Sequence, residues 1–181
     1  MNRKWLGMVL VLAGAAAGCG QGRIIFGVDV YSFLAGAKRD TITYYAPLPP
    51  GTPDTIPVQK INVLPVDAGS SIVDSATISG ALDFVNTSGT GNITFSVYID
   101  TVPGVYTKPP ILNVAAAVSG NATTNVPIAP VNLNAAVRQF FTSKQVYVGL
   151  RAAATASSPP VQGKAHLTAL HLVVAMQDKI F

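Results

Sequence analysis

The sequence predicts an all-β protein, an antiparallel β-sandwich with one short helix, and three observations support this fold class. Val, Ile, Thr and aromatic residues, which favour strands, are common, whereas glutamate is absent and lysine is scarce. Apolar and polar residues alternate over several segments, which is typical of strands with one buried face. Proline- and glycine-rich segments separate these strands at short intervals, as they do in sandwiches and barrels.

The clearest element is a predicted β-hairpin with arms at 77–86 and 93–100. In both arms apolar residues alternate with polar ones, and the apolar positions are Ile78, Leu82, Phe84, Ile93, Phe95, Val97 and Ile99. The segment 87–91 between the arms is a turn sequence of Thr, Ser and Gly. We therefore expect an antiparallel pair with one face on the core and the other in water.

The same reasoning places the remaining strands at about 24–34, 41–46, 58–66, 111–118, 126–133, 145–154 and 164–177. Turn sequences separate them at 47–57, 103–110, 119–125 and 157–163. One helix is predicted at 135–142. Asn134 is a suitable N-cap residue for it, and Val137, Phe140 and Phe141 give it an apolar side.

The first residues have the pattern of an export signal. Arg3 and Lys4 precede an apolar stretch over 5–17, and small residues lead directly to Cys19, the only cysteine of the chain. A membrane-spanning helix needs about 20 apolar residues, and this stretch is shorter. Small residues immediately before a cysteine resemble the lipobox of bacterial lipoproteins. The resemblance implies cleavage before Cys19, a covalent lipid on Cys19, and anchoring to the cell envelope.

This resemblance divides the chain into a signal peptide at 1–18, a lipidated cysteine with its tether at 19–23, and one β-sandwich domain at 24–181. In the lipoprotein family an acidic residue just after the cysteine can retain the protein at the inner membrane. This chain has Gly20 and Gln21 there. The resemblance therefore implies the outer membrane where the organism has two membranes.

Charge is sparse and excludes one class of partner. Charged residues make up 11% of the chain, against about 25% in typical soluble domains. Beyond Arg3 and Lys4 of the predicted signal, the basic residues are scattered singly apart from Lys38 and Arg39, so the sequence lacks the basic patch that nucleic-acid binding requires. A lightly charged surface suits contact with partner subunits or the envelope.

The last third of the chain has a recognisable order of elements. The predicted helix at 134–141 is followed by a strand ending in Gly149-Leu150-Arg151, then a loop, then a long strand from Ala165 to Met176. This order resembles the end of carbohydrate-binding-module-like jelly rolls. The resemblance implies a jelly-roll arrangement of the sandwich, and it transfers no binding residue, because a fold does not carry a function.

Side chains suited to catalysis do not converge in the sequence. His166 and His171 lie five residues apart on one predicted strand, which puts them on opposite faces unless a bulge intervenes. Asp83 and Asp100 flank the turn at unequal distances, so they are not the matched carboxylates that a glycosidase needs. We therefore predict that the protein is not an enzyme.

Two ligand sites are weaker alternatives to ordinary structural roles. Asp67 and Asp74 bracket residues 68–71 and offer oxygen ligands for calcium, although a plain turn explains Asp67 as well. Sugar stacking would use exposed rings, for which Tyr45, Tyr98 and Tyr106 are the candidates, although core packing explains them too. No other cofactor is expected. Three Asn-x-Ser/Thr triplets are interpreted as ordinary turn asparagines: those of Asn86, Asn92 and Asn121.

These observations predict a lipid-anchored envelope or surface protein with a structural or accessory, protein-binding role. Its expected partners are the membrane, through the lipid on Cys19, and either another envelope protein or further copies of the same chain. The alternative is a glycan-binding surface module, and an envelope hydrolase is the third and least favoured function.

Overall fold

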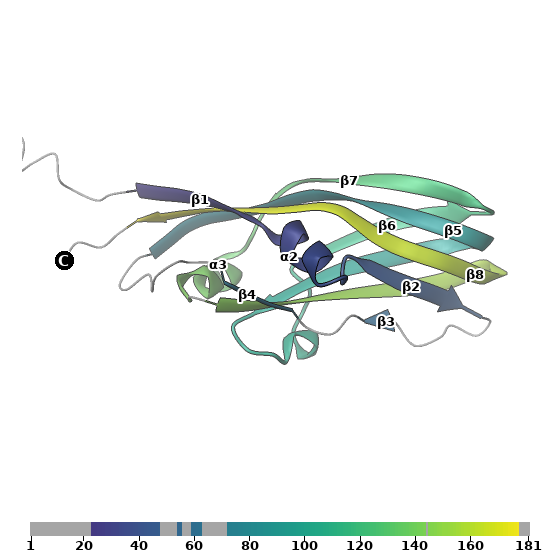
Figure 1. Cartoon of the computed structure of the whole chain (residues 1–181), viewed down its shortest axis with the longest axis horizontal. Helices are drawn as coiled ribbons and strands as arrows, with labels where there is room; N and C mark the ends of the chain where they lie inside the picture. The colour runs from purple at the N-terminus through teal and green to yellow at the C-terminus, as the bar shows by residue number, and fades with distance from the viewer. Residues whose placement is uncertain (1–22, 48–53, 56–58, 63–71, 144, 178–181) are drawn as a thin grey trace, which may run out of the picture.

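A computed structural model describes residues 23–47, 54–55, 59–62, 72–143 and 145–177 (Figure 1). The predicted export signal, Cys19 and Asp67 lie outside these residues. The described chain is mostly antiparallel β-structure, which confirms the predicted fold class, and its strands stack in two layers in a jelly-roll-like arrangement.

Two long strands form the centre of both layers. β5 (Ile72–Asp100) and β8 (Gln145–Gln177) pair antiparallel over almost their whole length. Figure 1 shows both strands turning back at one end of the molecule, where the register between them shifts repeatedly. We call this the fold-over end, formed by 86–91 of β5 and 156–163 of β8. The two halves of each strand therefore lie in different layers.

The first layer contains the first half of β5 and the second half of β8. β1 (Arg23–Asp29) and β2 (Thr41–Ala46) both pair with β8, while β7 (Ala122–Asn132) pairs with β5 on the other side. Among the described strands β1 pairs only with β8, so it lies at one edge of this layer and β7 at the other.

The second layer contains the other halves of the two long strands. β3 (Asp54–Thr55) and β4 (Gln59–Asn62) pair with the first half of β8, and β6 (Leu112–Ser119) pairs with the second half of β5. The core lies between the layers and is built from alternating positions of the strands. Its largest fully buried side chains include Tyr44, Ile78, Leu82, Phe84, Ile93, Phe95, Leu150 and Leu167.

The predicted hairpin at 77–100 was wrong in its pairing. Its arms are the two halves of β5, and each arm pairs with β8 rather than with the other arm. The predicted inward faces are correct, since Ile78, Phe84 and Phe95 are fully buried. Alternation reports which face is buried and not which strand lies alongside. The segment 157–163 was likewise predicted to separate two strands. It is instead the bend within the single strand β8.

A second helix replaces the end of the strand predicted at 24–34. α2 (Val30–Gly36) starts after Asp29, whose Oδ1 accepts a hydrogen bond from the Ser32 N–H at 3.3 Å. Val30 and Leu34 lie one helical turn apart and both are buried. The N-cap and this apolar side therefore outweigh the strand propensity of the segment.

The helix predicted at 135–142 is confirmed, with a change of type halfway. α3 (Ala135–Arg138) continues as the 3₁₀ turn η2 (Gln139–Thr142). Asn134 caps it as predicted, because its Oδ1 accepts a hydrogen bond from the Val137 N–H at 3.0 Å.

Asn86 joins three segments at the fold-over end. Its side chain is 1% exposed, and its Nδ2 donates to the carbonyls of Ser88, Gly89 and Gly120 at 3.0, 3.0 and 2.7 Å. Its Oδ1 accepts a hydrogen bond from the Tyr44 hydroxyl at 3.2 Å. The prediction of an ordinary turn asparagine at Asn86 is wrong. Instead Asn86 holds β2, the bend of β5 and the β6–β7 turn together.

Tyr44 makes the stability of the sandwich sensitive to alkaline pH. Burial raises the pKa of its phenol from the usual 10.0 to about 12. Because the pKa is raised on folding, this stabilising contribution is complete below pH 10.0 and is lost as the pH rises towards about 12.

We expect Tyr44→Phe to lower the unfolding free energy at neutral pH and to flatten its alkaline decline, as measured by urea unfolding between neutral pH and about pH 12. Tyr45→Phe, at an exposed neighbour, is the control and should show the same decline of unfolding free energy with pH as the wild type. The same decline in Tyr44→Phe would contradict the assignment of this pH dependence to Tyr44.

Candidate functional site

Tyr98 and Tyr106, two of the candidate sugar-stacking residues, pack against each other. The 3₁₀ turn η1 (Val105–Thr107) folds back over the outer face of the second layer, where Gly149 leaves room for the Tyr106 ring. The ring centroids are 5.2 Å apart in an edge-to-face arrangement. Tyr98 is only 5% exposed, so its ring offers no open face to a sugar. The wet face expected along 93–100 is therefore covered at its end by this loop.

Arg151 completes this tyrosine cluster. Its guanidinium carbon lies 5.1 Å from the Tyr98 ring centroid and 5.3 Å from that of Tyr106. The Tyr106 hydroxyl donates a hydrogen bond to the Leu150 carbonyl at 2.9 Å. The Arg151 Nε is buried and has no hydrogen-bond partner among the described residues, and the two rings lie against the guanidinium as cation–π contacts. The cluster fastens the loop to the sheet and presents no reactive group.

Tyr45 is the one sugar-binding candidate whose ring is open. It is 55% exposed on β2, whereas its neighbour Tyr44 is buried. The ring borders a shallow depression that is also lined by Thr43, Thr87, Gln162 and Lys164. Hydroxyl, amide and ammonium groups thus surround one exposed aromatic ring.

The two histidines lie on the same outer face, contrary to the prediction. A register shift leaves Thr168 without a partner on β5, so the strand gains one residue between His166 and His171. Each histidine contacts a different carboxylate. His166 Nε2 lies 3.3 Å from Asp40, and His171 Nδ1 lies 3.7 Å from Asp29.

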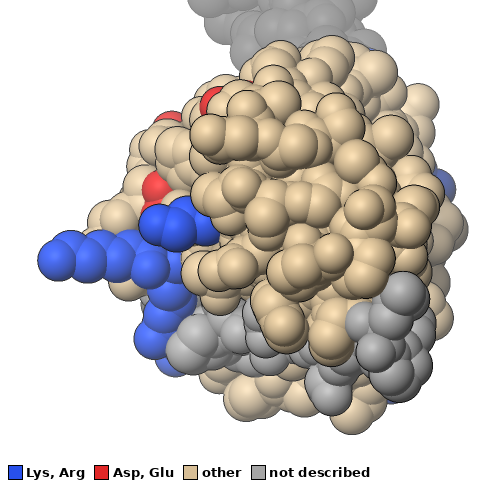
Figure 2. All heavy atoms as spheres, turned by 90° about the vertical axis from the view of Figure 1, so that its right-hand side faces the viewer, with Lys and Arg blue, Asp and Glu red and all other residues tan. Residues whose placement is uncertain are grey.

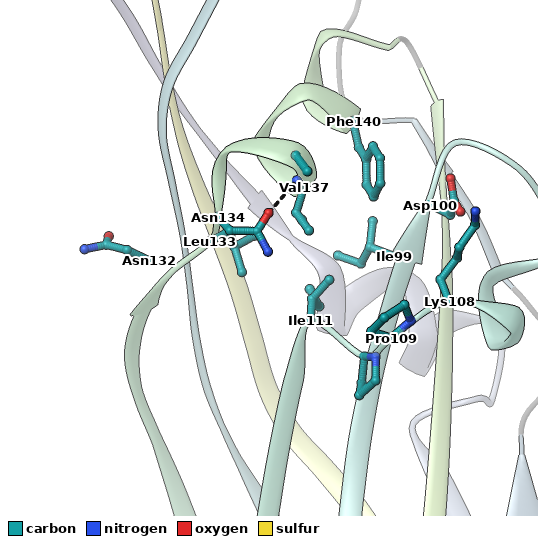
Figure 3. Close-up of a pocket in the computed structure, with 12 residues that line it drawn as sticks. Ile99, Asp100, Lys108, Pro109, Ile111, Asn132, Leu133, Asn134, Val137 and Phe140 are labelled. Atoms are coloured by element: carbon teal, nitrogen blue, oxygen red, sulfur yellow. Dashed lines mark hydrogen bonds between the residues drawn. The ribbon is translucent and has the colours of Figure 1, made fainter.

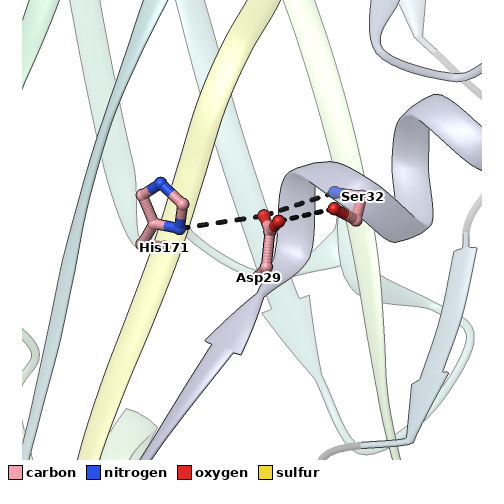
Figure 4. Close-up of polar contacts among 3 residues, drawn as sticks. All are labelled: Asp29, Ser32 and His171. Atoms are coloured by element: carbon pink, nitrogen blue, oxygen red, sulfur yellow. Dashed lines mark hydrogen bonds and ion pairs between the residues drawn. The ribbon is translucent and has the colours of Figure 1, made fainter.

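Asp29 is held mainly by the helix that it caps (Figure 4). The hydrogen bond from the Ser32 hydroxyl, more than the nearby His171, lowers the pKa of Asp29 below its usual 3.8. His171 is 55% exposed and Asp29 is 46% exposed. The pair is therefore an open surface contact beside the cap of α2.

Three further described acids, Asp74, Asp83 and Asp100, do not form a common site. Asp83 lies in the first layer and accepts a hydrogen bond from Asn125 Nδ2 at 2.7 Å. Asp100 lies in the second layer, buried, with its Oδ1 bonded to the Thr101 N–H at 2.6 Å. Asp74, the described half of the calcium candidate, contributes its backbone carbonyl to Arg138. Within the described part of the chain, no three acidic, histidine or cysteine residues gather as a metal site.

A pocket opens at the end of the sandwich opposite the fold-over end (Figure 3). Its volume is ≈ 470 Å³, and its walls come from the ends of β5 and β7, the 108–111 loop and α3. Figure 3 shows Ile99, Ile111 and Phe140 around an apolar centre, with Asp100 and Lys108 together on one side. These segments are distant in sequence, which is why no motif indicated the pocket. Its lining is mostly apolar with a few polar side chains, as is usual for pockets that bind small molecules.

Among the described residues, the two most exposed large aliphatic side chains lie on β1. Ile24 and Ile25 are 58% and 64% exposed, and Val173, which pairs with Gly27 from β8, is 46% exposed. We call Ile24, Ile25 and Val173 the β1 edge surface. Large aliphatic side chains grouped at the edge of a sheet are typical of an interaction surface. Composition alone did not distinguish them, because β1 has the same apolar residues as a core strand.

The fold-over end has a different character. Figure 2 shows this end as a mostly uncharged surface, with Lys and Arg gathered at one side. The residues of the bends in β5 and β8 are Ser, Thr, Asn, Gln, Gly, Pro, Ala and Val. Among the described residues no helix is long and apolar enough to cross a bilayer.

Comparison with known proteins identifies no family. No family model matches the chain, and no curated protein matches it. Solved structures of infectious bursal disease virus resemble it: the Gt strain (TM-score 0.47, 10% identity), the Gx strain (0.46, 9%) and virus-derived T=1 particles (0.44, 11%). These matches cover 88%, 88% and 90% of this chain and 38%, 38% and 37% of the viral chains. The chain thus spans well under half of the viral chains, and at these identities the likeness concerns the fold alone.

Proposed function

We propose that the protein is a lipid-anchored envelope or surface protein with a structural or accessory role, which binds another protein through the β1 edge surface. The observation that carries this proposal is the exposure of Ile24 and Ile25 on an edge strand. Edge strands accept a further strand through main-chain hydrogen bonds, and apolar side chains beside them add contact area.

The position of β1 along the chain supports this function. Arg23 begins the strand four residues after Cys19, and each residue of extended chain spans at most about 3.6 Å. A lipid on Cys19 would therefore hold the β1 edge surface close to the membrane, where neighbouring envelope proteins are concentrated.

The anchor is tested by Cys19→Ser in the full-length protein. We expect the wild type in the membrane fraction after cell disruption and most of the variant outside it, because the variant has no sulfur to carry the lipid. Gly22→Ala, in the same tether, is the matched control and should stay with the membrane. Equal membrane retention of Cys19→Ser and the wild type would contradict lipid anchoring.

The binding role is tested on the wild-type protein after mild detergent extraction, by measuring its native mass and identifying cross-linked neighbours. A complex with defined neighbours supports the structural role. A lone monomer contradicts it and favours the glycan alternative, for which the exposed Tyr45 ring is the residue to substitute.

A further inference from the structure

The two edges of the first layer differ in how they are protected. β7 carries Pro127 and Pro130, which have no N–H to donate to an added strand. β1 has no proline, and between its first and last residues it has no charge. It therefore keeps every backbone donor and acceptor that an added strand would need, among exposed isoleucines.

The charges of β1 stand only at its ends. Arg23 is exposed and forms no ion pair within the described chain, and Asp29 keeps 46% of its side chain exposed despite its contact with His171. A strand with a cation at its first residue and an anion at its last is complementary to itself in antiparallel orientation.

We propose that β1 pairs antiparallel with β1 of a second copy of this chain, with Phe26 at the centre and Arg23 opposite Asp29 of the second copy. The proposal rests on the proposed function, since it names the partner of the β1 edge surface. The pairing is symmetric, so one dimer contains the Arg23–Asp29 contact twice. The two first layers then join into one continuous sheet.

The side chains fit this register on both faces. On the outer face Ile25 lies opposite Gly27 of the second copy, and a Cβ placed on Gly27 would meet no atom within 4 Å. On the inner face Phe26, which is half-buried, lies opposite its own copy, and Ile24 lies opposite Val28. Ile24 therefore gains an apolar neighbour, and Gly27 leaves space for the Ile25 side chain.

Other registers lose these contacts. Paired residues must point to the same face of the sheet, so one β1 strand can slide along the other only in steps of two residues, in either direction. A shift of this kind shortens the pair and places Arg23 opposite Gly27, or Asp29 opposite Ile25. Only the register centred on Phe26 uses all seven residues and both charge pairs.

The register is tested by cysteine cross-linking in the full-length anchored protein, whose only native cysteine is Cys19. The single variants Ile25→Cys and Gly27→Cys are each produced alone and are also produced in the same cells. Extracts in mild detergent are then oxidised. We expect a cross-linked dimer mainly when both variants are present, because residues opposite each other in an antiparallel pair have a Cα separation that a disulfide accepts. Equal cross-linking when either variant is present alone would overturn the proposed register. The absence of a cross-linked dimer when both variants are present would overturn it as well.

The electrostatic contact is tested by charge reversal. Arg23→Asp places two carboxylates opposite each other, and Asp29→Lys places two cations opposite each other. Each variant alone should dimerise at least about tenfold more weakly than the wild type, and an equal mixture of the two should regain dimerisation because unlike charges again face each other. Asp29 also caps α2, so thermal unfolding of Asp29→Lys is needed to check that this variant still folds. Arg23→Asp leaves the helix cap intact and tests the same contact without this complication.

The outcomes separate this inference from the proposed function. Weakening by both reversals and recovery in the mixture supports the dimer. A native complex that contains one copy of this chain with a different protein overturns the dimer and leaves the protein-binding role intact. A lone monomer overturns both.

Discussion

Asn86→Ala is expected to lower the free energy of unfolding by roughly 3 kcal/mol. The substitution removes the donor to the carbonyls of Ser88, Gly89 and Gly120 and the acceptor of the Tyr44 hydroxyl. Each buried polar group left without a partner costs about 1–3 kcal/mol, and the sum is reduced because these groups share one network. Urea unfolding followed by circular dichroism measures the loss.

Asn92→Ala is the matched control for this prediction. Asn92 lies six positions further along β5 and is exposed, so its substitution should change the unfolding free energy by less than about 0.5 kcal/mol. Equal losses in the two variants would show that Asn86 does not organise the fold-over end.

Gly91→Ala is expected to cost about 3 kcal/mol or more, through overpacking between paired backbones. A Cβ at this position would overlap the carbonyl oxygen of Thr155 and lie 3.0 Å from Val161 Cγ2. The obstacle is backbone rather than a mobile side-chain end, so β5 and β8 must move apart where they bend together.

Gly27→Ala, measured on the monomeric protein, is the control for Gly91→Ala, because Gly27 also lies in a strand but within one copy of the chain has no atom within 4 Å of an added Cβ. Its alanine variant should be neutral or slightly stabilising, since alanine reduces the freedom of the unfolded chain. Thermal unfolding of both variants tests the comparison. A similar loss of stability at both positions would indicate that glycine is needed in these strands in general. It would contradict the explanation by close approach of the backbones at Gly91.

Much of the fold could be predicted from local pattern, and what failed was the partner of each strand. β2 was predicted with its observed bounds, and Asn134 caps α3 as expected. Both depend on neighbouring residues alone. The pairing of β5 with β8 depends on residues far apart in the sequence, and alternation carries no information about it. α2 was missed because a cap at Asp29 and burial of Leu34 decided against strand propensity.

The candidate site was harder to predict for the same reason. Tyr98 reads as a wet-face residue within its strand, and only the folding back of η1 buries it against Tyr106 and Arg151. Asn86 carried a local signal, because it lies two residues after the buried Phe84 and so on the same face of the strand, yet its three carbonyl partners lie around two separate bends. Lipidation of Cys19 stays a prediction, because that residue lies outside the described part of the chain.

The place of β8 after all the other described strands has a consequence for how the protein folds. β1 to β5 all pair with β8, and Ile72 near the start of β5 pairs with Gln177 near the end of β8. Such long-range pairing folds slowly, because most contacts join distant parts of the sequence. A chain that emerges from its N-terminus first has no closed core until its last strand is available. The sandwich can therefore close around its core only once β8 has been made, and β1 to β5 stay without this partner until then.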